Sequence, residues 1–523
     1  MESMDDRGLF GLLGAQADAQ PDAPFLYYED EVVSFSQLVA ESEKLARALQ
    51  RSGVGVGDRV AVLLLNRPEL VYAYFACFRL GAIAVPINTR YQRAEVAYVL
   101  EAAGVSAFIV GSNFFPMVTP LCRREELHEH TIVVDGKKDE VTPWPDYEDY
   151  VSGGEDVVLE WPVEMADCGA VMLHTSGSTA RPKGVIHSHE TLYSVARLNA
   201  DAYGIDKLTT TPIYLSACYI GGLGWQLLRN LIGGKSCVLI SKKEPSELLS
   251  AYRKHQCSDL VLLPTDVILM LEEPGVDEMD WSSLVLCASG GDRVTEVLQK
   301  EFSALTGVEI TEGYGMTECG PATVNPAYGL KKVGSIGLPL PGAEVLLSSG
   351  ETPHEVITGT GEIGEVWVKS PAVMVEYWRH PDATAEALVD GWLRTGDLAK
   401  RDEDGYYWFE GRKKLIIVRG GSNISPQEVE EVIDSHPAVM SCCVVGVPDA
   451  TFGEIVRAYV ELHHEDHRSA PAPSEDELMD YARHHIAAYK APEQVIFLDE
   501  MPCNTTGKMD RAAMRKMALE SVS

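Results

Sequence analysis

The chain has 523 residues, more than a single hydrophobic core normally supports, so several structural units are expected. With 46% hydrophobic and 23% charged residues, its composition is that of a globular protein and excludes a mostly disordered chain. Lys and Arg number 44 against 78 Asp and Glu, which gives a formal net charge of −34. Because such a chain repels a nucleic-acid backbone and an anionic membrane, we expect neither as a main partner.

The sequence gives no indication of a membrane span or of disulfides. Its first ten residues lack the basic and apolar regions of a signal peptide, and no run of about 18 apolar residues occurs. The eleven cysteines are scattered and include no C-x-x-C pair. We therefore expect a cytoplasmic protein with reduced, mostly buried thiols and no membrane insertion.

Strand and helix signals alternate through most of the chain. Leucines recur at helical spacing over residues 38–49, with Ser34 or Ser36 as the helix cap. Short apolar runs predict strands at 59–65, 107–110, 170–173, 237–240, 260–263 and 284–288. The polar stretches 135–158 and 463–477 predict surface loops. The alternation is typical of a layered α/β domain with largely parallel sheets.

The clearest domain boundary lies near Gly411 and Arg412. Beyond it the pattern predicts strands at 415–418, 442–447, 456–462 and 494–498, and helices at 426–435 and 475–486. Ser425 is placed to cap the first of these helices. We therefore predict a large domain over residues 1–411 and a small α+β domain over residues 412–523, joined by a short hinge.

Residues 175–184 (TSGSTARPKG) carry the strongest chemical signal and directly follow a predicted buried strand. Their hydroxyls and backbone amides would donate hydrogen bonds to a polyphosphate, and Arg181 and Lys183 would offset its charge. The Walker pattern of P-loop proteins is absent. For this segment alone, a polar turn rich in serine and threonine is the alternative.

This segment resembles the phosphate-binding loop of the adenylate-forming superfamily, which includes acyl-CoA synthetases, peptide-synthetase adenylation domains and luciferases. Further segments resemble the other motifs of that superfamily in the same order: residues 80–88 (LGAIAVPIN), 313–318 (GYGMTE), 394–397 (RTGD), 411–426, 445–449 (VGVPD) and 502–508 (PCNTTGK). The resemblance covers nearly the whole chain. It implies an α/β fold with a large N-terminal body of layered αβ subdomains, partly barrel-like, and a small mobile C-terminal domain.

The resemblance also implies an AMP-forming acyl-CoA ligase that uses ATP, Mg²⁺ and CoA. A carboxylate and MgATP would give an acyl-adenylate and pyrophosphate. The small domain would then rotate, and a thiol would attack the activated carbonyl and release AMP. A homodimer is one assembly we consider.

The resemblance assigns the functional residues of the superfamily to matching positions in this chain. Lys508, Thr175 and Lys183 would be catalytic, Glu318 would hold the metal, and Leu415 would be the hinge. Arg419, Gly420 and Gly421 would bind CoA. The nucleotide would contact Thr175, Ser176, Gly177, Ser178, Thr179, Lys183, Gly290, Gly291, Asp292, Glu312, Gly313, Tyr314, Gly315, Met316, Thr317, Asp397, Phe409 and Arg412. The acyl pocket would be formed by Leu215, Tyr219, Ile220, Gly221, Gly222, Gly290 and Met316.

These residue types suit the chemistry. A lysine at position 508 would lower the repulsion between a carboxylate and the α-phosphate and stabilise the transition state. Glu318 supplies an oxygen ligand of the kind that Mg²⁺ prefers. The carboxylate of Asp397 would accept both ribose hydroxyls. The alternative for each is a solvated surface residue or a turn residue.

Four positions depart from the usual pattern of the superfamily: Ala180, Leu215, Asp292 and Leu415. Ala180 restricts φ where glycine is usual, and Leu415 replaces a polar hinge residue. Drift is one explanation. The other is that adenylation is weak and that the protein is specialised for forming a thioester from a preformed acyl-adenylate.

The sequence indicates the class of carboxylic acid that the protein would use. Amino-acid-activating relatives usually carry an aspartate in the segment that here is 214–219 (YLSACY), so an α-amino acid is not expected. Apolar and glycine residues nearby indicate an apolar acid, bulky or cyclic. The acceptor is CoA or a separate acyl carrier protein. A non-catalytic protein that binds nucleotide or acyl-adenylate is the alternative from another class.

Overall fold

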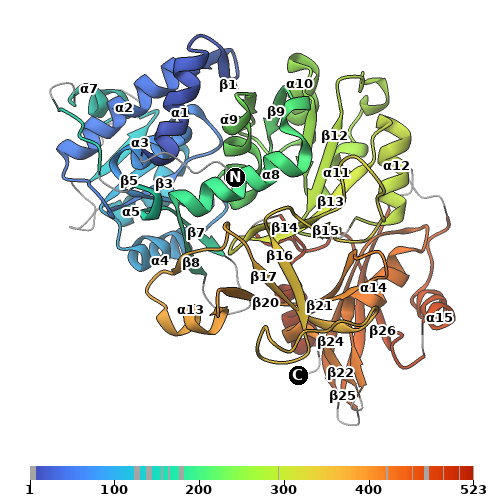
Figure 1. Cartoon of the computed structure of the whole chain (residues 1–523). Coiled ribbons are helices and arrows are strands. Elements are labelled where there is room, and N and C mark those ends of the chain that lie inside the picture. Colours follow the sequence, from blue (N-terminus) through green and yellow to red (C-terminus); the bar gives the residue numbers. More distant parts are fainter. Residues whose placement is uncertain are drawn as a thin grey trace.

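The computed structural model describes residues 7–122, 130–136, 144–154, 157–162, 165–175, 182–292, 294–419, 422–449, 452–463, 470–486, 488–505 and 507–521. The described residues form five β-sheets with helices packed against their faces (Figure 1). The blue-to-green part of the chain makes up a large body, and the orange-to-red part lies below it in this view. The expected α/β class is confirmed.

The first sheet of the body has the strand order β18-β8-β7-β4-β3-β5-β6. Its strands are β3 (Arg59–Leu63), β4 (Ile83–Pro86), β5 (Ala107–Gly111), β6 (Thr131–Val134), β7 (Gly169–Thr175), β8 (Lys183–Ser188) and β18 (Glu376–Tyr377). The strands from β7 to β6 run parallel, whereas β8 and β18 are antiparallel additions at one edge. These parallel strands are buried on both faces, which explains their continuous apolar runs.

Helices cover both faces of this sheet. One face packs against α1 (Gly8–Ala19), α2 (Phe35–Arg51), α3 (Pro68–Leu80) and α7 (Tyr147–Ser152). The other packs against α4 (Arg93–Ala103) and α5 (Phe115–Cys122). As predicted, α2 begins at Ser34, whose hydroxyl accepts a hydrogen bond from the Gln37 amide at 3.3 Å. Gln37 returns a side-chain bond to the Ser34 amide, completing a capping box.

Two further sheets complete the core of the body. One has the order β2-β1-β10-β9 and comprises β1 (Pro24–Tyr28), β2 (Glu31–Ser34), β9 (Thr210–Ile213) and β10 (Ser236–Leu239). The other has the order β11-β12-β13-β14-β15 and comprises β11 (Asp259–Leu262), β12 (Leu286–Gly290), β13 (Ile310–Met316), β14 (Gly320–Val324) and β15 (Leu338–Pro339). Strands β11, β12 and β13 are parallel, so their carboxyl ends lie at one edge.

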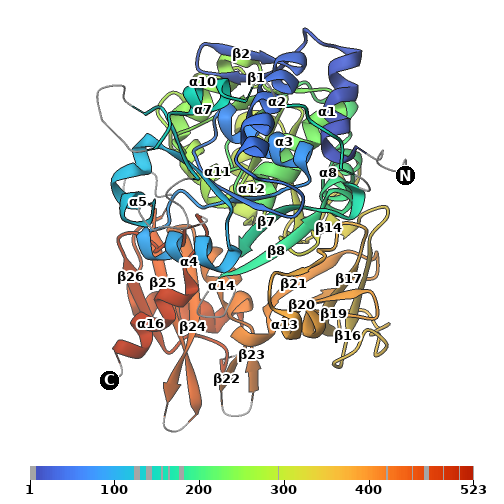
Figure 2. The ribbon, with the colours of Figure 1, turned by 90° about the vertical axis from the view of Figure 1, so that its left-hand side faces the viewer.

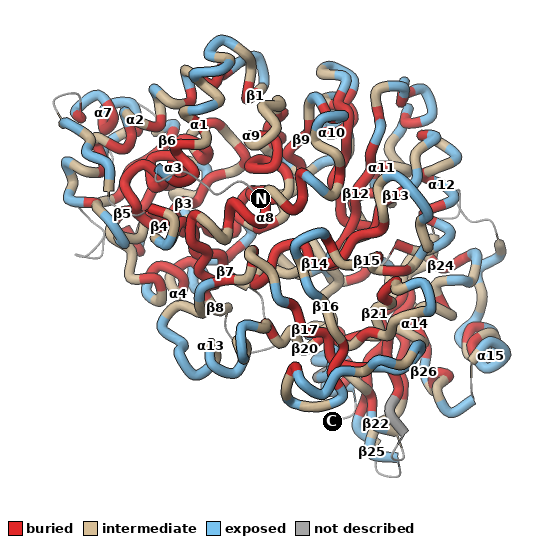
Figure 3. The backbone as a smooth tube through the Cα atoms, viewed as in Figure 1, coloured by how far each residue is buried: buried red, intermediate tan, exposed pale blue. Residues whose placement is uncertain are grey.

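The helices that pack on these sheets are α8 (His189–Tyr203), the π-helix η4 (Gly221–Leu228), α9 (Arg229–Gly233), α10 (Pro245–His255), α11 (Pro264–Leu271) and α12 (Glu296–Thr306). Short 3-10 turns are η1 (Ser112–Phe114), η2 (Met165–Asp167), η3 (Ile205–Lys207) and η5 (Val276–Glu278). In Figure 3 the buried backbone runs through the strands and α8, while exposed backbone lies on the outer helices.

The fourth sheet is antiparallel and leads towards the C-terminal part. It contains β16 (Glu344–Ser348), β17 (Ile363–Lys369), β19 (Leu388–Val389), β20 (Trp392–Arg401) and β21 (Tyr407–Arg412), with α13 (Pro381–Ala387) beside it. The expectation of largely parallel sheets is therefore wrong for this part. Antiparallel neighbours need no long crossover, and only a few residues join β19 to β20 and β20 to β21, whereas parallel strands need long crossovers.

The last sheet has the order β23-β22-β25-β24, with β26 paired to β25. It comprises β22 (Ile417–Arg419), β23 (Ser422–Ile424), β24 (Val439–Asp449), β25 (Gly453–Leu462) and β26 (Gln494–Leu498). Helices α14 (Pro426–Asp434) and α15 (Glu475–His485) cover one face, and α16 (Arg511–Glu520) covers the other. The predicted C-terminal strands and helices are all present. Figures 1 and 2 both place α14 beside β21 of the fourth sheet.

Two local predictions need correction. The stretch 135–158 was expected to be a loop, but it contains α7, which begins at Asp146 and buries Tyr147 and Tyr150. Ser425 does precede α14, yet its hydroxyl does not cap the helix: it donates instead to the carbonyl of Glu410 in β21. The stretch 463–477 lies partly outside the described residues, and α15 begins within it, at Glu475.

A buried ion pair joins helix α9 to strand β11 inside the body. Arg229 of α9 and Asp259 of β11 both have side chains with 0% exposure, and one guanidinium nitrogen lies 2.5 Å from the carboxylate. The hydroxyl of Thr211 donates to the other carboxylate oxygen at 2.7 Å.

We expect Asp259→Ala to lower the free energy of unfolding by about 3–5 kcal/mol, because it leaves a buried guanidinium without its counterion. The measurement is the first thermal unfolding transition of the full chain. Asp30→Ala is the matched control, because Asp30 pairs with Lys254 through exposed side chains and should change the transition little. Equal shifts for the two variants would contradict the prediction.

Candidate active site

A cavity of about 1950 Å³ lies between the body and the C-terminal part of the chain. Its walls include the carboxyl ends of β11, β12 and β13, the ends of β7 and β8 where the predicted phosphate loop is anchored, and β20 and β21. Asn504, Thr505 and Lys508 enter it from the C-terminal side. Crevices at the carboxyl ends of parallel strands are the usual ligand sites of such sheets.

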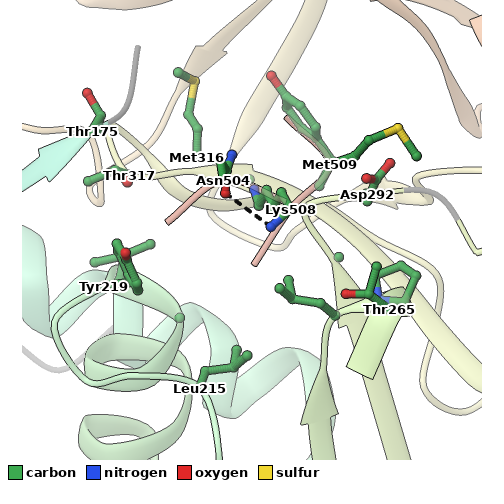
Figure 4. Close-up of a pocket in the computed structure, with 18 of the residues that line it drawn as sticks. Thr175, Leu215, Tyr219, Thr265, Asp292, Met316, Thr317, Asn504, Lys508 and Met509 are labelled. Carbon is green, nitrogen blue, oxygen red and sulfur yellow. Dashed lines mark hydrogen bonds between the residues drawn. The ribbon is translucent and has the colours of Figure 1, made fainter. Parts of the chain in front are cut away.

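The Lys508 side chain, shown in Figure 4, lies close to Gly291, the residue that follows β12. A Cβ atom added to Gly291 would lie 2.8 Å from the Lys508 Nζ and 2.8 Å from its Cε. Gly291 also has a φ of +82°, which residues with a side chain rarely adopt. The conformation and the lack of a side chain at position 291 therefore both make room for the lysine.

Hydrogen bonds from the body hold the loop that carries Lys508. The Thr505 carbonyl accepts from the Asn88 side-chain amide at 3.1 Å and from the Tyr219 hydroxyl at 3.2 Å. The Gly507 carbonyl accepts from the Thr265 hydroxyl at 3.4 Å. Within the loop, the Lys508 amide donates to the Asn504 side chain at 3.1 Å, the bond drawn in Figure 4. The C-terminal part is thus docked with its lysine in the cavity.

The charge of Lys508 is controlled by its surroundings. Burial lowers the pKa of Lys508 below its usual value near 10.5, and the positive charge of Arg412 acts in the same direction. The negative charges of Asp292 and Asp397 raise it. Asp292 therefore helps to keep the lysine protonated, which is the form that can stabilise an anion.

Asp397 stands at the centre of a polar cluster. Its carboxylate accepts a hydrogen bond from the Tyr314 hydroxyl at 2.7 Å and lies 3.1 Å from the Arg412 Nε. Asp397 and Arg412 face each other in register on β20 and β21. Burial raises the pKa of Asp397, and Arg412 opposes that shift. Each carboxylate oxygen still has acceptor capacity, so the pair fits the two hydroxyls of a ribose.

Glu318 follows β13 and is buried, which raises its pKa. The Tyr377 hydroxyl donates to it at 2.9 Å, and the Lys183 Nζ lies 4.8 Å from the centre of the Tyr377 ring. Among the described residues, no group of three or more His, Cys, Asp or Glu side chains is placed to hold a metal ion. A single carboxylate facing a phosphate site fits Mg²⁺, which is usually bound by one or two carboxylates together with substrate phosphates.

The structure also places the other predicted nucleotide residues. Thr175 and Lys183 pair in register at the ends of β7 and β8, so they close the base of the phosphate loop. Residues 176–181, which include Ser176, Gly177, Ser178 and Thr179, lie outside the described residues. The remaining predicted residues line the cavity: Gly290, Asp292, Glu312, Gly313, Gly315, Met316, Thr317 and Phe409.

Several of these residues also have structural roles. A Cβ on Gly315 would lie 2.3 Å from the Gly320 carbonyl, and one on Gly290 would lie 2.7 Å from the Gly313 carbonyl. Close strand packing therefore requires these glycines. The Glu312 carboxylate accepts from the Gly334 amide at 2.9 Å and so fixes the loop behind β14.

On the acyl side, Leu215, Tyr219, Ile220 and Gly221 line the cavity as expected. Gly222 lies away from the cavity wall, because it packs on the backbone of Ser216, whose carbonyl would lie 2.4 Å from an added Cβ. The expectation that Gly222 leaves space for the acid is therefore not met. Its position inside η4 explains the glycine instead.

Arg419, the one predicted CoA residue that the structure describes, is not in the cavity in this arrangement. Arg419 pairs with Glu493 and lies 4.3 Å from the centre of the Phe452 ring, outside the cavity wall. Gly420 and Gly421 lie outside the described residues, as does Ala180. The predicted hinge residue Leu415 lies in the 3-10 turn η6 (Lys413–Leu415) with an ordinary negative φ.

Comparison with known proteins identifies the family. The model of the AMP-binding enzymes matches residues 13–378, and the model of the AMP-binding enzyme C-terminal domain matches residues 428–508. The chain belongs to the AMP-binding enzyme family. The expected resemblance to the adenylate-forming superfamily is confirmed.

Individual relatives match over almost their whole length. The long-chain-fatty-acid–CoA ligase of Bacillus subtilis (strain 168) is 32% identical over 550 residues, which covers 99% of this chain and 96% of that protein. The fatty acid–[acyl-carrier-protein] ligase ScoC of Streptomyces coeruleorubidus is 32% identical over 514 residues, with 95% and 94% coverage. The solved structure of the anthranilate CoA ligase AuaEII in complex with anthranoyl-AMP matches with a TM-score of 0.90, 28% identity and 98% coverage of both chains.

This AMP-binding enzyme is therefore an AMP-forming acyl-CoA ligase that uses ATP, Mg²⁺, CoA and a carboxylic acid. Three residues of its site escaped the sequence analysis: Asn88, Thr265 and Tyr377. Asn88 ends the LGAIAVPIN segment, which was noted only as a structural motif. Thr265 and Tyr377 belong to no motif considered there, and only the fold brings them to the cavity. No helix in the described part of the chain combines the length and apolar character needed to cross a bilayer.

We expect Gly291→Ala to slow acyl-adenylate formation by about 100-fold, because the new methyl group displaces the Lys508 ammonium from the reacting atoms. The measurement is pyrophosphate release with saturating acid and ATP. Gly307→Ala is the matched control: Gly307 also has a positive φ, +75°, but a Cβ there would meet nothing within 4 Å. Similar losses in the two variants would mean that backbone strain, and not the position of Lys508, causes the effect.

We expect Asp292→Asn to move the alkaline limb of the pH profile of adenylation to lower pH. Removing a negative charge near Lys508 lowers its pKa further, so the lysine loses its proton at a lower pH than in the unaltered enzyme. The measurement is kcat/KM for pyrophosphate release against pH. Asp277→Asn makes the same change at an exposed residue that is not among the charges acting on Lys508. An unmoved limb in Asp292→Asn would contradict the prediction.

Proposed function

We propose that this ligase activates an apolar, bulky or cyclic carboxylic acid as its acyl-adenylate and then transfers the acyl group to CoA. The position of Lys508 carries the proposal. Its side chain lies close to Gly291 at the end of β12, in a cavity that Leu215 and Ile220 also line, and the charges of Asp397 and Arg412 act on it. A carboxylate attacking an α-phosphate would meet the lysine at this point.

We propose a role for each of the site residues. In the first step a carboxylate oxygen of the acid bonds to the α-phosphorus of ATP, and pyrophosphate leaves. The Lys508 ammonium reduces the repulsion between these anions, and Thr175 and Lys183 hold the departing phosphates. Asp397 and Arg412 hold the ribose. Glu318 would ligate Mg²⁺, which supplies charge neutralisation at the phosphates when bound, and Tyr377 orients that carboxylate.

In the second step the CoA sulfur bonds to the acyl carbonyl carbon, and the bond to AMP breaks. This step needs Lys508 to withdraw and Arg419, Gly420 and Gly421 to approach. We therefore propose a rotation of residues 412–523 against residues 1–411, with Leu415 at the hinge. β21 ends at Arg412 and η6 begins at the next residue, which supports a boundary there.

The proposal also covers which thiol accepts the acyl group and how fast adenylation is relative to thioester formation. Similarity to ScoC makes a separate acyl carrier protein the second candidate for the acceptor. The docked lysine favours an enzyme that carries out adenylation itself over one restricted to thioester formation. A cytoplasmic location, where ATP and CoA are available, and a homodimer stay predictions.

The test is a panel of carboxylic acids assayed in parallel for pyrophosphate release and for acyl transfer to CoA or to a holo carrier protein. We expect at least one apolar cyclic acid to give both pyrophosphate and the CoA thioester. Lys508→Ala should lower pyrophosphate release by about 100- to 1000-fold, because the charge that stabilises the transition state is lost.

The same Lys508→Ala variant, supplied with synthetic acyl-adenylate, should still form the CoA thioester at a rate close to that of the unaltered enzyme. That result separates loss of adenylation from loss of folding. Transfer to the carrier but not to CoA would move the assignment to the second candidate. Unchanged pyrophosphate release in Lys508→Ala would reject the role of the lysine.

A further inference from the structure

Helix α8 presents two polar side chains to the acyl side of the cavity. Asn199 and Tyr203 both line it, with exposed fractions of only 1% and 6%. They are four residues apart and therefore lie on the same face of the helix. Neither belongs to a motif noted in the sequence.

Neither side chain has a hydrogen-bond partner among the described residues. In the described part of the chain, no hydrogen bond reaches the Asn199 amide group, whose Oδ1 is fully enclosed, or the Tyr203 hydroxyl. The Nε1 of Trp225, on the facing helix η4, is likewise enclosed without a partner. Buried polar groups are hydrogen-bonded in the great majority of cases, so the enclosed Asn199 Oδ1 and Trp225 Nε1 at one end of a ligand cavity need an explanation.

The surroundings of these groups are otherwise apolar and uncharged. Helices α8 and η4 also contribute Ala202 and Gly221 to the wall, and none of the residues they contribute to it is charged. Arg229, the cation that acts electrostatically on Tyr203, is fully buried and paired with Asp259. A charged group of a ligand would find no counterion at this end, and burying it would be costly.

The distance to Lys508 favours a compact ligand. The Tyr203 hydroxyl lies 3.5 Å from the position of a Cβ on Gly313. Gly313 pairs in register with Gly290, which directly precedes the glycine under Lys508. Tyr203 and Lys508 therefore approach the ends of two neighbouring strands, β13 and β12, which lie about 5 Å apart.

We propose that the acid carries one uncharged hydrogen-bonding substituent, such as a hydroxyl, keto or neutral amino group, on a compact apolar body. Asn199 and Tyr203 bind this substituent and make it a determinant of specificity. The inference rests on the proposed function, because it assumes that the cavity binds a carboxylic acid beside Lys508. It refines the expectation of an apolar acid to an apolar acid with a polar end.

Binding of such a substituent satisfies the two side chains, whereas an acid without it leaves them buried and unpaired. Sites built to hydrogen-bond a substrate group discriminate strongly against analogues that lack it. We therefore expect a preference for the substituted acid of about tenfold for each hydrogen bond made.

The experiment uses the full chain and matched pairs of acids: benzoic and cinnamic acid against their hydroxy and amino derivatives at each ring position. The readout is the ratio of kcat/KM for pyrophosphate release within each pair. Tyr203→Phe removes only the hydroxyl, and Asn199→Leu replaces the amide with an apolar group of similar size. Ser194→Ala is the matched control, because Ser194 is also buried and unpartnered on α8 but does not line the cavity.

We expect the unaltered enzyme to prefer at least one substituted acid, and Tyr203→Phe to reduce the ratio of kcat/KM within that pair about tenfold. Ser194→Ala should keep the full preference. If Asn199→Leu fails to fold, Tyr203→Phe still decides the question.

Equal use of substituted and unsubstituted acids by the unaltered enzyme would overturn the proposal, and so would a preference that survives in both variants. In either case pyrophosphate release itself continues, and the proposed function stands. Absence of pyrophosphate release with every acid would instead reject the proposed function together with this inference.

Discussion

The structure depends on one approach between two parts of the chain: the side chain of Lys508 lies against the backbone of Gly291. The lysine belongs to the C-terminal part, and the glycine ends a strand of the body. Hydrogen bonds from Asn88, Tyr219 and Thr265 to the loop of Lys508 hold the two together. A few bonds of this kind fix a position without making it permanent, since each contributes only about 1 kcal/mol. That suits a domain that must dock for one step and leave for the next.

The site is more than a basic cleft in an acidic protein surface, because carboxylates lie among its cations. Several cations near the cavity are already paired: Lys413 with Glu351 and Glu365, Arg419 with Glu493, and Arg511 with Glu430. Lys508 and Arg412 act on the buried carboxylate of Asp397, Arg412 and Asp397 act on the buried Glu318, and Asp292 acts on Lys508. Burial raises the pKa of both carboxylates and lowers that of Lys508, so each group depends on its neighbours to stay charged.

The sequence predicted the C-terminal elements closely, because their strands contain short apolar runs and Pro426 and Ser474 mark helix starts. It missed α7, which has six residues in a polar stretch and too few turns for a periodic signal. Motif residues such as Asp397, Glu318 and Lys508 were found because each lies in a short recognisable segment. Asn88, Tyr219 and Thr265 as partners of the lysine loop were not, because they lie 417, 286 and 242 residues from their partners. Such contacts depend on how whole sheets pack together, so patterns in short stretches of sequence do not predict them.

The central claim is that the docked arrangement belongs to adenylation and is left when CoA reacts. Distances between spin labels at Glu301→Cys on α12 and Asp476→Cys on α15, in a Cys503→Ser background that removes an exposed thiol, test it directly. With ATP and an unreactive analogue of the acid, the account predicts a single distance that matches the docked structure. With a stable acyl-adenylate analogue and CoA, it predicts a second, clearly different distance. The same distance under both conditions, in an enzyme that forms thioester, would contradict the account.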